Sequence, residues 1–183
     1  MPYKSEKTEI PDLIILEPTV HTDDRGCFFE SYNHRDFHKI VGLGCDFVQD
    51  NHSKSKRGVL RGLHYQIQHP QGKLVRVIQG AVFDVAVDLR RSSMHFGRWF
   101  GIELSAENKR QFWIPPGFAH GFIVTTETAE FLYKTTDYWF PEHERTLLWN
   151  DGDLGIRWPD GYNPNLSDKD LRGKSLKLAE VFD

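Results

Sequence analysis

Short alternating β patterns separated by turn residues constrain this chain more than any other feature. The clearest case is KLVRVI at 73–78 followed by VFDVAVDL at 82–89, with a glycine-containing turn at Gln79–Gly80 between them. Further runs of this kind, bounded by the turn sequences AENK, PPG and TTET, are found at 99–104, 111–114, 121–125 and 130–138. Short strands at this spacing, with little helix between them, predict an antiparallel sandwich or barrel.

The register of the first pair of strands depends on the length of their turn. A two-residue loop at Gln79–Gly80 predicts a hairpin in which Val75 faces Asp84. Lys73 and Asp84 then become diagonal neighbours that are close enough to form an ion pair. A three-residue loop would break this register. The shared face predicted by the two-residue loop carries Lys73, Val75, Val77, Val82, Asp84 and Ala86.

The N-terminal third predicts shorter elements around this β core. A strand is expected over 9–17, behind a proline, and a second over Cys27–Tyr32 after a turn at Asp23–Gly26. A brief strand is expected at Phe47–Asn51. The sequence SKSKRG at 53–58 then predicts a polar loop.

One short helix is predicted over 34–41, HRDFHKIV. Asn33 is typical of a helix N-cap, and Gly42 is typical of a helix end. His34 and His38 lie one helical turn apart on it, a spacing that can bind a metal ion. With no third ligand near them in the sequence, a solvated helix face is the expected role.

Composition restricts the class of protein. A chain of 183 residues fits one domain, 1–183, with a core at about 14–150 and a C-terminal extension at 151–183. A net charge of −3 gives no general attraction to nucleic acid or to an anionic membrane. No apolar run approaches the ~20 residues of a membrane span, and MPYKSEKTEI lacks the apolar core of a signal peptide. Cys27 and Cys45 make no disulfide framework, so we expect a cytoplasmic protein.

The segment Gly58–Gly80 contains two cations and a titratable imidazole, Arg61, Lys73 and His64. His64 is the natural proton carrier among them because its unperturbed pKa lies near neutrality. Arg61 can bind a carboxylate or a phosphate through two N–H groups at once. Taken alone, His64 would more often be a hydrogen-bonded structural histidine.

A second motif places this segment in a class of fold. IPPGFAHGF at 114–122 matches the cupin motif P-x-G-x-x-H, with His120 as its histidine. In metal-binding cupins, a glutamate ligand stands seven residues before the glycine that corresponds to Gly80. Here that residue is Lys73, which would repel a metal ion. We therefore expect an all-β cupin, a jelly-roll β-barrel with short peripheral helices and an ordered tail, that uses no metal and no cofactor.

A specific resemblance covers most of the chain. RGLHYQ, PQGKLVRVIQG, IPPGFAHGF, EFLYKTTDYW and SDKDLRG occur in the order typical of the dTDP-4-dehydrorhamnose 3,5-epimerase family, and the similarity runs from Ile14 to Lys177. The resemblance implies a dTDP-4-keto-6-deoxyhexose substrate, dTDP-4-dehydro-6-deoxy-D-glucose, inverted at C3 and C5 to dTDP-4-dehydro-L-rhamnose for rhamnose-containing polysaccharide. The C4 ketone acidifies both protons, so one base can remove each in turn and an acid on the opposite face can return it.

The resemblance also implies roles for individual residues. His64 matches the base, Asp170 the carboxylate that orients it, and Tyr133 the proton donor. Lys73 would stabilise the enolate oxygen. Tyr138 is a rival donor, although an odd spacing from Tyr133 points the two to opposite faces of a regular strand. The implied substrate-binding positions are Arg25, Glu30, Gln49, Asn51, Arg61, Lys73, His120, Tyr138, Glu144 and Lys169.

The family further implies a homodimer. In it, the stretches DDRGCFFE and QDN at 23–30 and 49–51 serve the site of a neighbouring subunit. Arg61 and Lys169 suit diphosphate oxygens, and Gln49 and Asn51 can pair with a thymine edge.

Plainer interpretations stand beside these roles. The tail from Asp151 onward predicts ordered coil with one helical turn at Ser167–Leu171. Within it, Ser167-x-x-Asp170 is typical of a capping box, and both roles of Asp170 can coexist. Tyr133 could simply pack within its strand, and His120 could be a satisfied core histidine.

Other activities fit parts of the pattern. Epimerisation at a single carbon and 3,4-ketoisomerisation use related substrates. His64 together with Tyr133 favours epimerisation, but it does not distinguish one inverted centre from two. A metal-dependent cupin oxygenase and a non-catalytic sugar-nucleotide-binding cupin are the alternatives of a different class.

Overall fold

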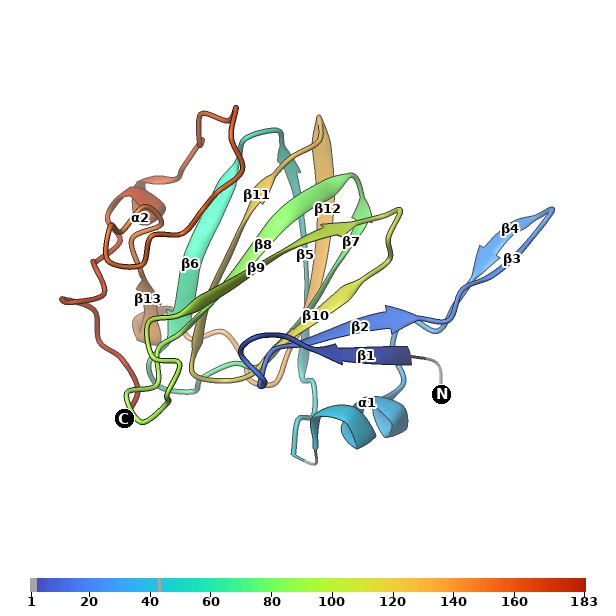
Figure 1. The fold of residues 1–183 in the computed structure, drawn as a ribbon, viewed down its shortest axis with the longest axis horizontal. Coiled ribbons are helices and arrows are strands. Elements are labelled where there is room, and N and C mark those ends of the chain that lie inside the picture. The colour runs from blue at the N-terminus through green and yellow to red at the C-terminus, as the bar shows by residue number, and fades with distance from the viewer. Residues whose placement is uncertain (1–2, 43) are drawn as a thin grey trace.

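The computed structural model describes residues 3–42 and 44–183, and two antiparallel sheets form its body (Figure 1). The six-stranded sheet contains, in spatial order, β1 (Tyr3–Lys7), β2 (Ile14–Pro18), β10 (Gln111–Ile114), β7 (Lys73–Gln79), β12 (Thr128–Thr135) and β5 (Gln49–Lys56). The five-stranded sheet contains β13 (Glu144–Thr146), β6 (Leu60–Gln66), β11 (Phe118–Val124), β8 (Ala81–Asp88) and β9 (Trp99–Ser105). The predicted all-β, cupin-like architecture is confirmed.

Apolar side chains from both sheets fill the space between them. Val75 and Phe112 of the six-stranded sheet share one buried cluster with Val82, Leu104 and Phe122 of the five-stranded sheet. Each strand presents alternate residues to this layer, as the period-2 pattern requires. The inward-facing polar residues therefore lie in a largely apolar interior.

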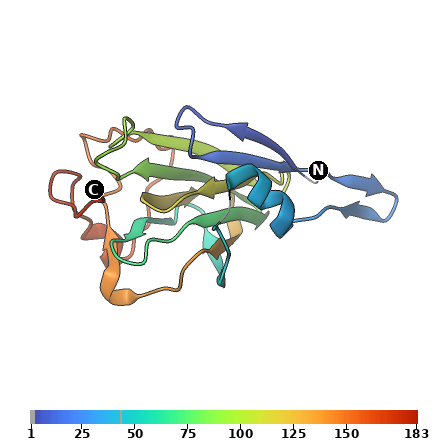
Figure 2. The ribbon, with the colours of Figure 1, turned by 90° about the horizontal axis from the view of Figure 1, so that it is seen from below.

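The outer faces of the two sheets are covered differently. Helix α1 (His34–Val41) lies over the six-stranded sheet (Figure 2). There Phe37 packs edge-on against Trp113, with ring centroids 5.2 Å apart. The C-terminal tail covers the five-stranded sheet, with Leu154 and Ala179 in a second buried cluster. The tail carries α2 (Asp168–Leu171), and a short 3₁₀ turn, η1 (Pro141–His143), precedes β13. No helix in the described parts of the chain is long and apolar enough to cross a membrane.

The hairpin predicted for 73–89 is wrong. β7 pairs with β10 and β12, whereas β8 pairs with β9 and β11, so the chain passes from one sheet to the other at Gly80. Gly80 has φ of 71°, and a Cβ there would overlap the carbonyl oxygen of Thr128. The predicted face is nevertheless buried, because the inner faces of the two sheets meet.

The peripheral elements agree with prediction in part. α1 is confirmed at 34–41, with the Asn33 side chain accepting from the backbone N–H of Asp36. The sequence did not predict β1. It predicted a strand that begins at residue 9, whereas β2 begins at Ile14. The strand predicted at Cys27–Tyr32 is shorter, because β4 (Gly26–Phe28) pairs only with β3 (His21–Asp23).

The polar loop predicted at 53–58 is wrong over most of its length. β5 continues to Lys56 as an edge strand that pairs with β12 alone. Its sequence, QDNHSKSK, has no apolar residues, and backbone hydrogen bonds to β12 hold it in the sheet. β12 ends at Thr135, so the strand predicted over 130–138 is too long at its C-terminus.

Candidate active site

A cavity of about 350 Å³ lies between the two sheets and is lined by side chains from both. Nine of the residues implied by the resemblance line it: Gln49, Asn51, Arg61, His64, Lys73, His120, Tyr133, Glu144 and Lys169. They come from six strands and from the tail, so only the folded chain brings them together. The inner sides of the two sheets therefore form one concave polar site in an apolar interior.

His64 lies on β6 and is held by the tail. Its Nε2 is hydrogen-bonded to Oδ1 of Asp170 at 2.6 Å. Asp170 is only 3% exposed and is the N3 residue of α2, where Ser167 completes the predicted capping box. The hydroxyl of Ser167 donates to Oδ2 of Asp170 at 2.7 Å. The structural and the orienting arrangement of Asp170 therefore exist together.

The environment of this pair sets its protonation. Burial raises the pKa of Asp170, but hydrogen bonds from His64 and Ser167 outweigh it and lower that pKa to about 2. Burial lowers the pKa of His64, and Asp170 opposes that shift. At neutral pH the imidazole is therefore uncharged, with Nε2–H directed to the carboxylate. Nδ1 is then the nitrogen that can accept a proton from a ligand.

Lys73 is a buried cation on the opposite sheet. It is 7% exposed, and its Nζ donates to the backbone carbonyl of His64 at 3.3 Å. Burial lowers its pKa to about 8, although the negative charges of Glu144 and Asp84 oppose that shift. No carboxylate of the described residues pairs with it, so the predicted ion pair with Asp84 is wrong. An ammonium in this position favours an anionic oxygen in the cavity.

Asp84 pairs instead with His120. Both carboxylate oxygens of Asp84 lie within hydrogen-bond distance of Nε2 of His120, at 3.0 and 2.9 Å. Burial raises the pKa of Asp84, while His120 and Lys73 lower it. His120 stands directly opposite His64 on adjacent strands, so both rings lie on the same face. The close approach of these strands requires glycine at 121, where a Cβ would lie 2.6 Å from the Arg61 carbonyl oxygen.

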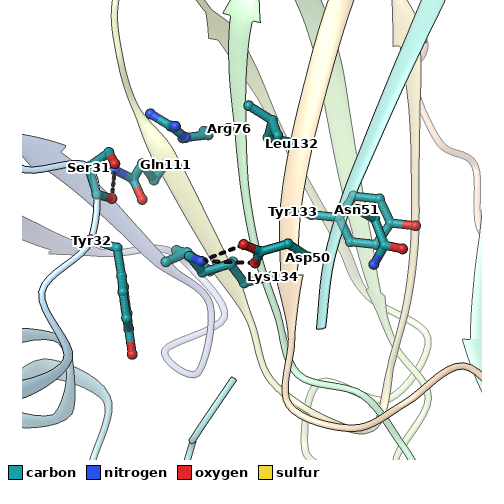
Figure 3. A pocket seen from close by; sticks show the side chains of 10 residues that line it. Ser31, Tyr32, Asp50, Asn51, Arg76, Gln111, Leu132, Tyr133 and Lys134 are labelled. Atoms are coloured by element: carbon teal, nitrogen blue, oxygen red, sulfur yellow. Dashed lines mark hydrogen bonds and ion pairs between the residues drawn. The ribbon is translucent and has the colours of Figure 1, made fainter. Parts of the chain in front are cut away.

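Tyr133 faces the cavity from β12, in the sheet opposite His64. It stands directly across from Asn51 on β5, and Figure 3 shows these two side chains together, apart from Arg76 and Gln111. Arg76 and Gln111 line a separate, smaller pocket of about 170 Å³, which Tyr133 and Asn51 also border. Burial and then the charge of Glu144 raise the pKa of Tyr133, so its phenol is protonated at neutral pH.

Tyr138 does not line the cavity. It lies beyond the end of β12 and is 57% exposed, so the comparison with Tyr133 by strand alternation does not apply. The neighbouring Trp139 lines the cavity instead. A single chain therefore does not bring Tyr138 to the cavity, because β12 ends before reaching it.

Polar side chains surround the mouth of the cavity. Lys169 forms an ion pair with Glu144 at 2.9 Å, and Nε of Arg61 donates to Ser55 at 3.0 Å. Arg61 gives no other side-chain hydrogen bond within the described chain, which leaves its terminal amino groups for a ligand. Gln49 donates to Asn51 at 2.9 Å.

Several lining residues were not predicted: Ser53, Gln71, Gly121, Phe122, Phe131 and Trp139. Two of them follow from strand alternation. Ser53 extends the series of Gln49 and Asn51 along β5, and Phe131 precedes Tyr133 by two residues on β12. The others depend on pairing between distant segments, which no local pattern shows.

Arg25 and Glu30 lie away from the cavity of their own chain. Arg25 is at the turn of the β3–β4 hairpin, which projects from the body in Figure 1. Its side chain is 90% exposed and pairs with Asp23. Neither residue lines the cavity, so their predicted binding role finds no place within one chain.

Known proteins share both this sequence and this fold. Residues 7–178 match the family described as dTDP-4-dehydrorhamnose 3,5-epimerase. The chain belongs to that family. The family's enzyme from Pseudomonas aeruginosa is 63% identical over 179 residues, covering 98% of this chain and 99% of the relative.

Two solved structures of the family are also similar. The enzyme from Legionella pneumophila in complex with dTDP-4-keto-L-rhamnose has a TM-score of 0.95 and 51% identity, covering 97% of this chain and 95% of that one. A 3′-monoepimerase from Streptomyces bikiniensis in complex with dTDP-quinovose has a TM-score of 0.89 and 34% identity, covering 94% and 87% of the two chains. Solved structures with this fold therefore include both a 3,5-epimerase and a 3′-monoepimerase.

Proposed function

We propose that the chain is a dTDP-4-dehydrorhamnose 3,5-epimerase that converts dTDP-4-dehydro-6-deoxy-D-glucose into dTDP-4-dehydro-L-rhamnose. One observation carries the proposal beyond family membership. His64 and Tyr133 enter one cavity from opposed sheets, so a sugar ring between them has a base on one face and an acid on the other. Removal of a proton from one face and its return to the other inverts a carbon centre.

His64 is the base in this mechanism. Nδ1 takes the proton from the carbon next to the C4 ketone, and the electron pair left behind forms an enolate. Asp170 holds Nε2–H at 2.6 Å and stabilises the imidazolium that results. Its pKa of about 2 keeps the carboxylate charged throughout the neutral range.

Lys73 and Tyr133 complete the reaction. The enolate carries its negative charge on the former ketone oxygen, where the buried ammonium of Lys73 stabilises it. Tyr133 then gives its phenolic proton to the carbon from the opposite face. The imidazolium and the phenolate return to their starting states by proton exchange with solvent, and the second carbon reacts in the same way.

The remaining polar residues suit the nucleotide. Arg61 and Lys169 can bind diphosphate oxygens, Arg61 through amino groups that Ser55 leaves free. Gln49 and Asn51, linked to each other at 2.9 Å, offer donors and acceptors for the base.

A dimer accounts for the residues that lie away from the cavity. The β3–β4 hairpin carries Arg25 and an exposed Phe28, 70% accessible, outside the body of its own chain. We place this hairpin against a second copy of the chain, where Arg25 and Glu30 reach the partner's cavity. The two unpaired cysteines, Cys27 and Cys45, agree with a cytoplasmic location.

Proton NMR of the substrate in deuterated water tests the activity directly. The expected result is deuterium at both C3 and C5, with the inverted product accumulating. His64→Ala should abolish exchange at both carbons while leaving nucleotide affinity nearly unchanged, since the diphosphate contacts remain. Exchange at C5 that survives in this variant would contradict the single-base mechanism.

The same spectra separate the alternatives. Exchange and inversion at one carbon alone would identify a single-position epimerase, the outcome that the Streptomyces bikiniensis structure makes relevant. No exchange at either carbon, with the nucleotide still bound, would identify a binding module.

A further inference from the structure

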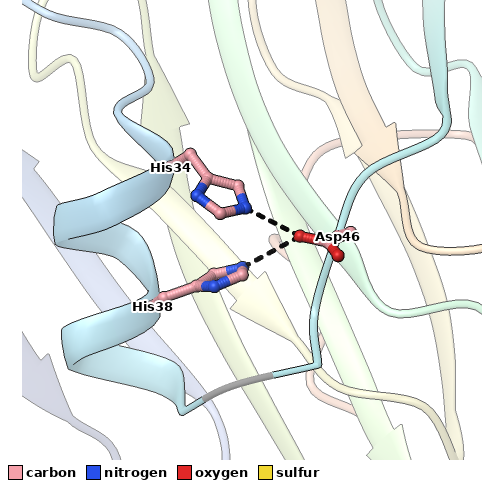
Figure 4. Close-up of side chains that lie close together, drawn as sticks. All are labelled: His34, His38 and Asp46. Carbon is pink, nitrogen blue, oxygen red and sulfur yellow. Dashed lines mark hydrogen bonds and ion pairs between the residues drawn. The ribbon is translucent and has the colours of Figure 1, made fainter.

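Two histidines of α1 and an aspartate of the following loop form a compact group outside the cavity (Figure 4). Nε2 of His34 lies 2.7 Å from Oδ1 of Asp46, and Nε2 of His38 lies 3.5 Å from the same oxygen. All three ligand atoms lie within 4.8 Å of one another. The solvated face predicted for the two histidines rested on the lack of a third ligand in the sequence, and the fold supplies one.

His38 is the residue that points to a missing ligand in this group. Its side chain is only 10% exposed, and its Nε2 is buried with no hydrogen-bond partner in the described chain. Native structures rarely leave a buried polar atom without a partner. Figure 4 shows this nitrogen directed toward Asp46, at the point where His34 also converges.

We propose that His34, His38 and Asp46 bind a divalent transition metal ion of the Zn²⁺ class. Two imidazole nitrogens and one carboxylate oxygen are ordinary zinc ligands, with water completing a tetrahedron. Ligands held about 2.1 Å from a tetrahedral ion lie about 3.4 Å apart. The 3.5 Å between His38 and Asp46 matches this spacing.

The remaining ligand needs only a small adjustment. His34 stands 2.7 Å from Asp46, the distance of a hydrogen bond, and its side chain is 61% exposed and free to move. When the metal binds, the proton on Nε2 of His34 is lost to solvent and Nδ1 takes one up, so the neutral imidazole binds through Nε2. Imidazole ligands disfavour Ca²⁺ and Mg²⁺, which prefer oxygen ligands.

The ion would have a structural role. Asp46 precedes β5 by three residues, and β5 carries Gln49 and Asn51 into the cavity. The site therefore joins α1 to the segment that leads into the active-site edge strand. We expect metal binding to stabilise the fold without supplying chemistry to the reaction.

Metal titration of the full chain, stripped with a chelator, tests the proposal. Zn²⁺ is followed by calorimetry, and Co²⁺ by its visible absorption, which reports coordination directly. We expect one saturable site in the wild type and at least about 10-fold weaker binding in Asp46→Asn and in His34→Gln. The matched control is His21→Gln, an exposed histidine on the β3–β4 hairpin, which should bind as the wild type does.

Two further measurements assign the site. His64→Ala should retain the ion, which separates this group from the imidazoles of the cavity. Zn²⁺ at about 100 times its dissociation constant should raise the wild-type Tm by roughly 5–10 °C and leave that of Asp46→Asn nearly unchanged.

Equal affinity in the wild type, Asp46→Asn and His34→Gln would place the metal elsewhere and overturn the proposal. An absence of saturable binding below millimolar Zn²⁺ would overturn it as well. Melting in excess chelator shows that each variant is folded. His34→Gln changes an exposed side chain, so it decides the matter if Asp46→Asn fails to fold.

Discussion

Lys73 shows how one buried residue can set the pH range of the reaction. In the proposed mechanism Lys73 acts as a cation, so its side chain must be protonated. Burial lowers its pKa to about 8. His64 must be neutral to act as the proposed base, and burial lowers its pKa as well. The rate should therefore rise with pH through the pKa of His64, below its usual value, and fall again as Lys73 loses its proton.

We predict that Lys73→Met removes the alkaline limb of the profile of kcat/KM against pH. Turnover at neutral pH should fall ~100-fold or more because the enolate oxygen loses its cation. The control is Lys177→Met, whose side chain is 77% exposed on the tail, and which should keep both the limb and the rate. A limb near pH 8 that persists in Lys73→Met would assign it to another group.

The residues of the site differ in how far the sequence alone could reveal them. Lys73 was identified because it stands seven residues before Gly80, at the position of the cupin glutamate ligand. Its burial was predicted from the alternation of its strand. His64 and Asp170 lie 106 positions apart, so only the family resemblance joined them. Asp46 was missed because it meets His38 through a loop, and no spacing rule describes that contact.

Strands and helices were predictable where local patterns decide them. β10 and α1 have the predicted bounds because turn residues and a cap mark their ends. β7 and β8 were assigned to one hairpin because alternation identifies a buried face without identifying the sheet. The strand predicted at 47–51 ends too early, because β5 is an edge strand held by backbone hydrogen bonds and its sequence has no apolar pattern.

Helix α2 connects the stability of the tail to the orientation of His64, the proposed base. Ser167 caps this helix and also donates to Asp170, which holds His64. Ser167→Ala should cost about 1 kcal/mol of unfolding free energy, which lowers Tm by roughly 2–4 °C. It should also lower kcat with little change in KM, because the carboxylate loses a hydrogen bond at 2.7 Å.

Ser105→Ala is the matched control for this prediction. Ser105, the last residue of β9, accepts a hydrogen bond from the backbone N–H of Asn108 at 3.0 Å and lies outside the cavity. Its loss should lower Tm by a similar amount and leave kcat unchanged. Ser167→Thr should restore the wild-type rate. If Ser167→Ala has a lower Tm but the kcat of the wild type, the Ser167 cap stabilises the tail without affecting the reaction.

At the scale of the whole molecule, two opposed sheets explain why the proposed base and the proposed acid face each other. β6 carries His64 and β12 carries Tyr133, and neither sheet alone could flank a sugar ring. The same architecture leaves the β3–β4 hairpin projecting from the body, with Phe28 exposed (Figure 1). The proposed dimer would cover this residue.

Complementation between two inactive variants tests the dimer and its shared sites together. One chain carries His64→Ala, and the other carries Arg25→Ala with Glu30→Ala. In a mixed dimer, the second chain keeps its own His64 and receives an intact hairpin from the first, so one of its two cavities is complete. Random pairing makes half of the dimers mixed, so co-expression should restore about a quarter of the wild-type activity at low substrate concentration. Activity no greater than the sum of the two parents would mean that each hairpin serves its own chain or no site at all.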